Sequence, residues 1–181
     1  MTISEIYSTF KKSTGICTDT RKIEKGNLFF ALKGPNFNAN KLAKEALQKG
    51  AIAAIIDDKN FVEEHTILVD DALDTLQKLA NTHRNNFDIP FIGITGSNGK
   101  TSTKELIVKV LETNYNVHYT LGNLNNHIGV PLTLLALKDD AEIAIIEMGA
   151  NKTGDIKELC DIADRDFGMI TNIGKAHLEG F

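Results

Sequence analysis

The chain has 181 residues, a formal net charge of −4 and an isoelectric point near 5.7. Hydrophobic residues make up 42% and charged residues 24%, which is typical of a globular protein with one large or two small domains. This acidic balance argues against a nucleic-acid binder that works through a broad basic surface. No apolar run approaches the roughly 18 residues of a membrane span. The two cysteines, Cys17 and Cys160, lack C-x-x-C spacing, so they predict a reducing, cytoplasmic compartment and no disulfide framework.

The first half of the chain predicts a small α/β domain. Three short apolar runs bounded by glycine or aspartate are typical of buried strands, at residues 27–34, 51–57 and 66–70. Between the first two runs lies a helical pattern that ends at Gly50. A second helical pattern leads into a linker at residues 85–90, so we expect the first domain to cover residues 1–86.

After Pro90, strands and helices alternate regularly. Strands are expected at residues 91–95, 115–120, 142–149 and 167–173, and helices at residues 101–114, 128–138 and 156–163. This alternation calls for a parallel sheet with right-handed crossovers. We therefore assign residues 87–181 to a second α/β domain.

Polar clusters follow all four predicted strands of this second domain. They are residues 95–101, Asn123 with Asn125 and Asn126, Glu147, and residues 172–177. In an open parallel sheet, the carboxyl ends of the strands meet at one edge, and ligands bind there. The sequence therefore predicts a ligand site at this edge.

The segment GITGSNGKTS, residues 93–102, does not fit the usual phosphate-loop pattern G-x-x-x-x-G-K-[ST], because Ile94 stands five places before Gly99. Its chemistry nevertheless suits a phosphate. The glycines let the backbone turn its N–H groups inward, and the following helix adds its N-terminal partial positive charge. Lys100 supplies a charge for the β/γ-phosphates, and the Thr101 hydroxyl is placed to ligate Mg²⁺. The alternative is a glycine-rich turn with a surface lysine, but the position between a buried strand and a helix favours a nucleotide site.

Three further residues are candidates for metal binding or for purely structural roles. Glu147 offers the hard oxygen that Mg²⁺ selects, although a single carboxylate at a sheet edge is more often merely solvated. A single histidine such as His177 is more often a hydrogen-bonded surface residue than a ligand, but its place beyond a strand, beside Lys175 and Glu179, favours a metal role. His127 is expected to cap or pack at a helix start.

Four segments together resemble the Mur ligase family: GITGSNGKTSTKE, GNLNNHIGVPLTLL, EMGANKTGDIKELCDIA and TNIGKAHLEGF. The shorter T-G-x-N-G-K-T loop is that family's own form. Residues 18–37, TDTRKIEKGNLFFALKGPNF, resemble the first domain of the branch that joins D-alanyl-D-alanine to UDP-N-acetylmuramoyl-tripeptide. The resemblance implies a small N-terminal α/β substrate domain followed by a parallel-sheet, P-loop-type ATPase domain.

The implied activity is ATP-dependent amide-bond formation through an acyl phosphate, in peptidoglycan precursor synthesis, with Mg²⁺ as a cofactor. The resemblance implies catalytic roles for Lys100, Glu147 and His177, and metal ligation by Thr101, Glu147 and His177. The residues implied in ATP binding are Thr95, Gly96, Ser97, Asn98, Gly99, Lys100, Thr101 and Ser102. Those assigned to binding of the UDP-sugar peptide are Thr18, Asp19, Thr20, Arg21, Asn125 and Asn126.

The sequence departs from the family at several places. Residues 38–40 replace a usual Asp-Gly-His segment, and Arg165 stands where proline is frequent. The family carries more sequence after HLEGF, including a third domain and a lysine that is carbamylated to help hold a second Mg²⁺. We therefore expect an N-terminal piece, truncated within the ATPase domain, inactive alone and with an unpaired sheet edge. Two alternatives stay open: another Mur-type ligase, such as a folylpolyglutamate synthase, or a non-catalytic nucleotide-binding module.

Overall fold

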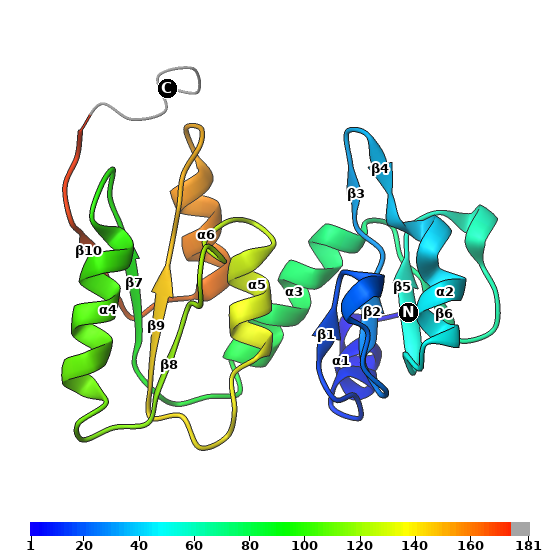
Figure 1. Ribbon diagram of the computed structural model, residues 1–181, viewed down its shortest axis with the longest axis horizontal. Helices are drawn as coiled ribbons and strands as arrows, with labels where there is room; N and C mark the ends of the chain where they lie inside the picture. Colours follow the sequence, from blue (N-terminus) through cyan, green and yellow to red (C-terminus); the bar gives the residue numbers. More distant parts are fainter. Residues whose placement is uncertain (175–181) are drawn as a thin grey trace. The chain divides into compact units, whose positions relative to one another are not determined.

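The computed structural model describes residues 1–174 as two α/β units, each with its own parallel sheet (Figure 1). The units divide between Leu79 and Ala80, inside a helix. Within the described part of the chain, no helix is long and apolar enough to cross a membrane.

The first unit is built on a four-stranded parallel sheet with the strand order β1-β2-β5-β6. Its strands are β1 (Ile16–Cys17), β2 (Leu28–Phe30), β5 (Ala53–Ile56) and β6 (Thr66–Leu68). Its helices are α1 (Ile3–Phe10), α2 (Ala43–Gln48) and the beginning of α3 (Ala72–Arg84). The three predicted strands are confirmed, and β2 and β5 are buried at every position because both faces of this sheet are covered.

Shorter elements complete the first unit. Strand β3 (Lys33–Gly34) pairs with β4 (Phe37–Asn38) in an antiparallel hairpin. Three short 3-10 turns are η1 (Thr20–Lys22), η2 (Ala39–Leu42) and η3 (Lys59–Phe61). Helix α1, which the sequence analysis did not anticipate, starts with a capping box: the Thr2 hydroxyl accepts from the Glu5 amide, and the Glu5 carboxylate accepts from the Thr2 amide.

The second unit contains a four-stranded sheet with the order β10-β7-β9-β8, in which every pair is parallel. Its strands are β7 (Phe91–Thr95), β8 (Val117–Tyr119), β9 (Ile143–Glu147) and β10 (Phe167–Ile170). Its helices are α4 (Lys100–Leu111), α5 (Gly129–Leu135) and α6 (Asp155–Ala163). All four predicted strands and three predicted helices are present, and the parallel α/β architecture is confirmed.

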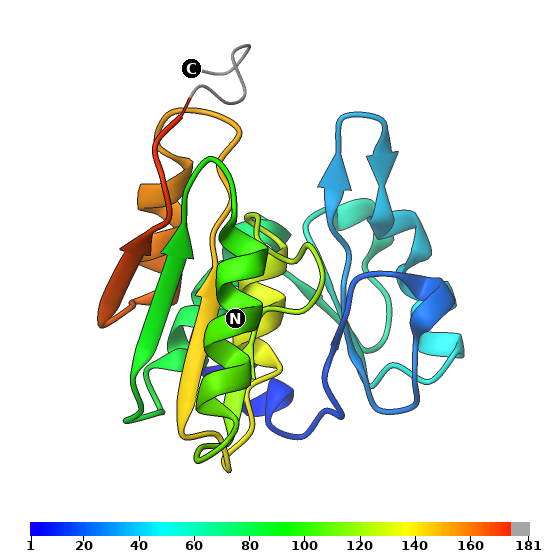
Figure 2. The same cartoon turned by 60° about the vertical axis from the view of Figure 1, so that its left-hand side comes forward.

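Helix α4 covers one face of this second sheet (Figure 2). Val108 of α4 packs with Ile94 of β7 and Ile145 of β9, and all three side chains are fully buried. This packing fixes the first turn of α4 above the carboxyl ends of β7 and β9, where the polar clusters lie. On the sheet's edge, β10 pairs with β7 alone among residues 1–174, and its side chains are exposed throughout, as expected of an uncovered edge.

Candidate functional site

The loop between β7 and α4 depends on two glycines with positive φ. Gly96 has φ 142° and Gly99 has φ 78°, a region that favours glycine. A Cβ on Gly96 would also clash with Oγ1 of Thr171. Gly99 is the N-cap of α4 and provides no side-chain cap, so the first amides of this helix keep their hydrogen-bonding capacity. The arrangement is that of an anion site at a helix N-terminus.

Lys100 folds back over this loop. Its Nζ donates to the carbonyl oxygen of Gly96 at 2.6 Å and lies 3.4 Å from that of Ser97. These acceptors are neutral, and an ammonium group binds a charged phosphate oxygen more strongly than a carbonyl. Because the lysine side chain is long and flexible, its charge can move from the loop to a phosphate without a change in the backbone.

A segment after β10 holds the loop from the other side. The carbonyl of Asn172 accepts from the Ser97 amide and its side-chain oxygen accepts from the Asn98 amide, both at 3.1 Å. Thr171 Oγ1 donates to the carbonyl of Asn98 at 2.6 Å. The amides of Ser97 and Asn98 are thus engaged within the protein, which leaves the amides at the start of α4 for an anion. The sequence predicted a polar segment here, but no role for Thr171 or Asn172.

Glu147 ends β9 and is only 1% exposed, yet it faces the start of α4. Its Oε1 accepts from Thr101 Oγ1 at 3.1 Å and from Asn125 Nδ2 at 2.8 Å. Its backbone amide donates to Thr120 Oγ1 at 2.9 Å. The other carboxylate oxygen, Oε2, is buried and has no hydrogen-bond partner among the residues that the structure describes. The structure therefore brings together Thr101, Asn125 and Glu147, which the sequence predicted separately.

Lys104 is a fully buried cation beside this carboxylate, and the sequence analysis missed it. Its Nζ donates to the carbonyl of Thr120 at 2.6 Å and lies 3.9 Å from Oε2 of Glu147. It also pairs with the half-exposed Glu105 at 3.0 Å. A buried carboxylate needs a nearby positive charge to stay ionised. A lysine one helical turn after Thr101 lies on the same side of α4, and that spacing was the available signal.

The donor set of Thr101 and Glu147 fits Mg²⁺, which prefers hard oxygen ligands and few protein ligands. The 3.1 Å contact between Thr101 Oγ1 and Glu147 Oε1 supports this fit, because it places two hard oxygen donors side by side. His177, the remaining predicted metal ligand, lies outside the described residues. Thr95 directs its hydroxyl to the Met148 carbonyl at 2.9 Å, which ties the loop's first residue to the strand that carries Glu147.

Asn125 and Asn126 differ in what their side chains do. Asn125 orients Glu147, as described above, and its carbonyl accepts from the Gly149 amide at 2.7 Å. Asn126 stabilises the turn that leads into α5, since its Oδ1 accepts from the amides of Ile128 and Gly129 at 3.0 and 2.9 Å. Asn125 therefore belongs to the site around Glu147, and Asn126 has a structural role in the described contacts.

In the first unit, the predicted segment from Thr18 to Arg21 forms the turn η1. Asp19 caps it by accepting from the Arg21 amide at 3.0 Å, and the Arg21 guanidinium pairs with the same carboxylate at 2.7 Å. The side-chain and backbone hydrogen bonds of Arg21 lower the pKa of Asp19 to about 2. Thr20 is buried, whereas the side chain of Arg21 is 85% exposed and keeps donors open to solvent.

The departure at residues 38–40 has a structural explanation. Asn38 caps η2 by accepting from the Asn40 amide at 3.0 Å. Asn40 is buried, accepts from the Asp57 amide at 2.9 Å and donates to Asp57 Oδ1 at 2.8 Å. Lys33 of β3 pairs with the same carboxylate at 2.9 Å. These two asparagines thus tie the hairpin region to the end of β5.

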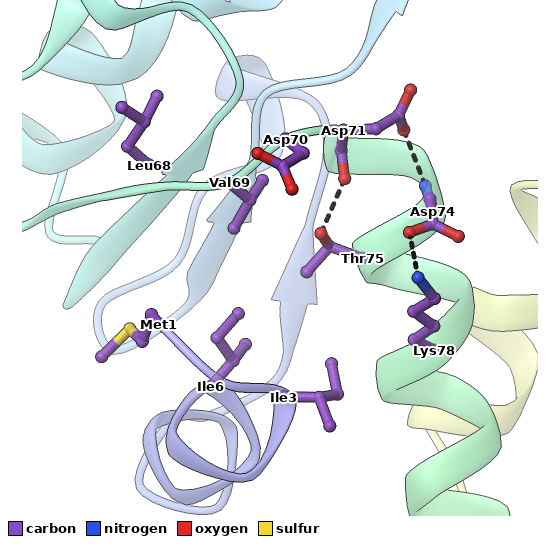
Figure 3. Close-up of a pocket in the computed structure, with 10 residues that line it drawn as sticks. All are labelled: Met1, Ile3, Ile6, Leu68, Val69, Asp70, Asp71, Asp74, Thr75 and Lys78. Carbon is purple, nitrogen blue, oxygen red and sulfur yellow. Dashed lines mark hydrogen bonds and ion pairs between the residues drawn. The ribbon is translucent and has the colours of Figure 1, made fainter.

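The first unit also has a cavity of about 350 Å³ near the start of α1 (Figure 3). Its polar side comes from the start of α3, where Asp74 pairs with Lys78 and the Asp71 carbonyl accepts from Thr75. None of the residues predicted for nucleotide or substrate binding lines it. The cavity is therefore separate from the candidate site.

Comparisons with known sequences agree with the resemblance. Residues 12–117 match the model described as "Mur ligase family, catalytic domain", and residues 94–181 match "Mur ligase middle domain". The chain is 47% identical over 169 residues to the UDP-N-acetylmuramoyl-tripeptide–D-alanyl-D-alanine ligase of Bacillus subtilis (strain 168). The aligned residues cover 91% of this chain and 37% of that protein. The same-named ligase of Escherichia coli (strain K12) is 39% identical over 166 residues, 92% of this chain and 37% of that protein. The chain thus spans little more than a third of these relatives' length.

Solved structures give the same result. Crystal structure I of MurF from Acinetobacter baumannii has a TM-score of 0.90 at 32% identity, over 99% of this chain and 42% of that one. The MurF ligase from Thermotoga maritima, solved in complex with ADP, has a TM-score of 0.85 at 36% identity, over 94% of this chain and 39% of that one. Because one family model alone matches more than half of the sequence, and the relatives share both the fold and the sequence, this chain belongs to the Mur ligase family.

Proposed function

We propose that this chain is the nucleotide- and substrate-binding part of an ATP-dependent ligase that joins D-alanyl-D-alanine to UDP-N-acetylmuramoyl-tripeptide in peptidoglycan precursor synthesis. The observation that carries the proposal is the glycine loop with Lys100, Thr101 and Glu147 at one sheet edge, in a chain 47% identical to a ligase of that name. Residues 1–86 would bind the UDP-sugar, and residues 87–181 would bind ATP.

The chemistry asks the protein mainly for positioning and for charge neutralisation. Lys100 and the first amides of α4 would hold the β- and γ-phosphates. The terminal carboxylate of the tripeptide would attack the γ-phosphorus of ATP, form an acyl phosphate and release ADP. The amine of D-alanyl-D-alanine would then attack the acyl carbon, lose a proton and expel phosphate. In this scheme Lys100 lies beside the phosphoryl group that is transferred, and its ammonium group stabilises the negative charge of that group in the transition state.

Thr101 and Glu147 would hold Mg²⁺, which when bound would neutralise charge on the phosphate oxygens. Asn125 and Thr120 orient Glu147 through the hydrogen bonds described above. Lys104, which is fully buried, lies 3.9 Å from Oε2 of Glu147 and balances its charge. We also propose His177 as a ligand of a second ion, on the strength of the family resemblance.

Arg21 is the strongest candidate for a contact with the UDP phosphates in the first unit. Its guanidinium is exposed and already oriented by Asp19, which lowers the entropy lost when it binds an oxyanion. Thr18, Asp19 and Thr20 form the turn that presents it.

We place the reaction in the cytoplasm, because it consumes ATP and because Cys17 and Cys160 are unpaired thiols that suit a reducing compartment.

Calorimetric titration of MgATP tests the nucleotide site. Lys100→Ala is expected to weaken MgATP binding by about 10-fold or more, because a hydrogen bond to a charged group contributes about 1.5–3 kcal/mol. The matched control is Lys109→Ala, which removes an exposed lysine of the same helix. Equal affinities in the wild type and Lys100→Ala would remove the loop from the proposal.

A further inference from the structure

We propose that His127, Asp155 and Glu158 form a binding site for a divalent transition-metal ion of the Zn²⁺ class, distinct from the candidate Mg²⁺ site. His127 Nε2 and one carboxylate oxygen from each acid all lie within 4.8 Å of one another. His127 stands just before α5, and the two acids lie in the first turn of α6. Their spacing of three residues places both acids on one face of that helix.

Asp155 provides an independent observation that points to a ligand. Its side chain is almost fully buried, and its Oδ2 accepts from the amides of Asn151 and Lys152 at 2.8 and 3.0 Å. Its Oδ1 has no hydrogen-bond partner anywhere in residues 1–174 and lies 3.8 Å from His127 Nε2. A buried carboxylate oxygen without a hydrogen-bond partner has lost its bound water and has gained no interaction that offsets the free-energy cost. A cation between Oδ1 and the imidazole would supply such an interaction.

The environment of Asp155 also favours a fixed ligand. Its Oδ2 accepts from the backbone amides of Asn151 and Lys152, and His127 Nε2 lies 3.8 Å from Oδ1. The same two amides fix the carboxylate plane, so Oδ1 is held toward His127. A carboxylate that is already oriented loses less conformational freedom when it binds a cation.

The distances fit a small tetrahedral site after a minor movement. Metal–ligand bonds of about 2.0–2.2 Å in a tetrahedral zinc site separate the ligand atoms by about 3.3–3.6 Å. The observed separations bracket this range: His127 Nε2 is 2.7 Å from Glu158 Oε2 and 3.8 Å from Asp155 Oδ1. The Glu158 side chain is 58% exposed and can shift outward. One imidazole with two carboxylates is a zinc-type donor set, whereas Mg²⁺ would favour oxygen ligands alone.

A metal ion at this site would stabilise the fold, because it would join two separate segments of the second unit. His127 follows Asn125, which orients Glu147, and a bound ion would tie this segment to the start of α6. Helices α5 and α6 are neighbours in the second unit (Figure 1). An ion that binds the folded chain and not the unfolded one would raise the unfolding temperature. A simple ion pair between His127 and Glu158 would join the same two helices without any metal.

The test is calorimetric titration of the metal-free chain with ZnCl₂, together with titration by CoCl₂ followed by visible absorption. We expect the wild type to bind one equivalent of Zn²⁺. The affinity should fall by at least about 10- to 100-fold in His127→Gln and in Glu158→Gln, because even the loss of a residue that only hydrogen-bonds a metal ligand has an effect of this size. Asp161→Asn is the matched control, because Asp161 is an exposed acid of α6 paired with Lys157. It should bind like the wild type.

Both test variants change partly exposed side chains, so they are expected to fold, and circular dichroism in the absence of metal verifies this. The Co²⁺ absorption bands and the Zn²⁺-induced rise in unfolding temperature should disappear in the same two variants. Zn²⁺ affinity that is equal in the wild type, His127→Gln and Glu158→Gln would overturn the proposal. The absence of a bound equivalent in the wild type would also overturn it and would leave the ion pair as the role of these residues.

Discussion

The buried pair of Lys104 and Glu147 is the residue-level feature on which the candidate site depends. Glu147 lies on the last position of a fully buried stretch of β9, and Lys104 reaches it from α4. Neither side chain has solvent to stabilise its charge, since they are 0% and 1% exposed. Each charge is therefore stabilised by partners inside the protein, which for Lys104 are Glu105 at 3.0 Å and Glu147 at 3.9 Å. This arrangement holds a carboxylate in place beside the loop between β7 and α4.

We expect Lys104→Met to lower the free energy of unfolding by about 3–5 kcal/mol, because Glu147 would keep a buried charge without its partner. Urea denaturation measures this loss. The double variant Lys104→Met/Glu147→Gln should lose less than the sum of the two single variants, as coupled residues do. Lys109→Met, an exposed position on the same helix, is the control and should change stability by less than about 0.5 kcal/mol. Strict additivity would mean that the two charges do not interact.

Asp19 and Arg21 give a prediction about pH. Side-chain and backbone hydrogen bonds of Arg21 bring the pKa of Asp19 from 3.8 down to about 2. Because the folded value is the lower one, the pair stabilises the turn above about pH 4 and loses this contribution as the pH falls toward 2. The carboxyl carbon resonance of Asp19 should titrate near pH 2, and Arg21→Gln should move the midpoint upward. A midpoint already near 3.8 in the wild type would contradict the pairing.

At the level of elements, the strand–loop–helix unit of β7 and α4 is held by contacts on both sides of the loop. We expect Gly96→Ala to destabilise the chain by more than about 1 kcal/mol and to weaken MgATP binding, because φ is 142° and Thr171 occupies the space of a Cβ. Thermal unfolding and calorimetry measure the two effects. Gly34→Ala in β3 is the control, since a Cβ there meets nothing within 4 Å. A Gly96→Ala chain with unchanged stability and affinity would show that the loop is adaptable.

The same elements show what the sequence could predict. Strands β7 and β9 were predicted because strands covered on both faces of a parallel sheet appear as continuous apolar runs. Helix α1 and the hairpin of β3 and β4 were not, since they are short and their signals are local caps and turns. Lys104 was missed because lysine on an amphipathic helix is usually exposed. The contact of Thr171 with Asn98 joins residues 73 positions apart, and no local pattern encodes such a pair.

At the level of the whole molecule, two units with separate sheets divide the proposed work. The second unit has the glycine loop between β7 and α4 and the buried carboxylate, and the first has the turn that exposes Arg21. The chain matches 37% of the Bacillus subtilis relative and 42% of the Acinetobacter baumannii structure. Most of the length of these relatives therefore lies outside the match, and we propose that the groups that would bind the incoming amine lie there.

Because the chain matches only 37% of the Bacillus subtilis relative, we expect that the 181 residues, assayed by themselves, form no adduct with D-alanyl-D-alanine. Without groups that orient the amine, the reaction loses an advantage of up to about 7–11 kcal/mol. Each missing charge-stabilising contact costs about 3–4 kcal/mol more in the transition state. The assay combines phosphate release with mass spectrometry, using ATP, Mg²⁺, UDP-N-acetylmuramoyl-tripeptide and D-alanyl-D-alanine. If a pentapeptide product accumulates, and disappears in Lys100→Ala, the residues of these two units are sufficient for catalysis.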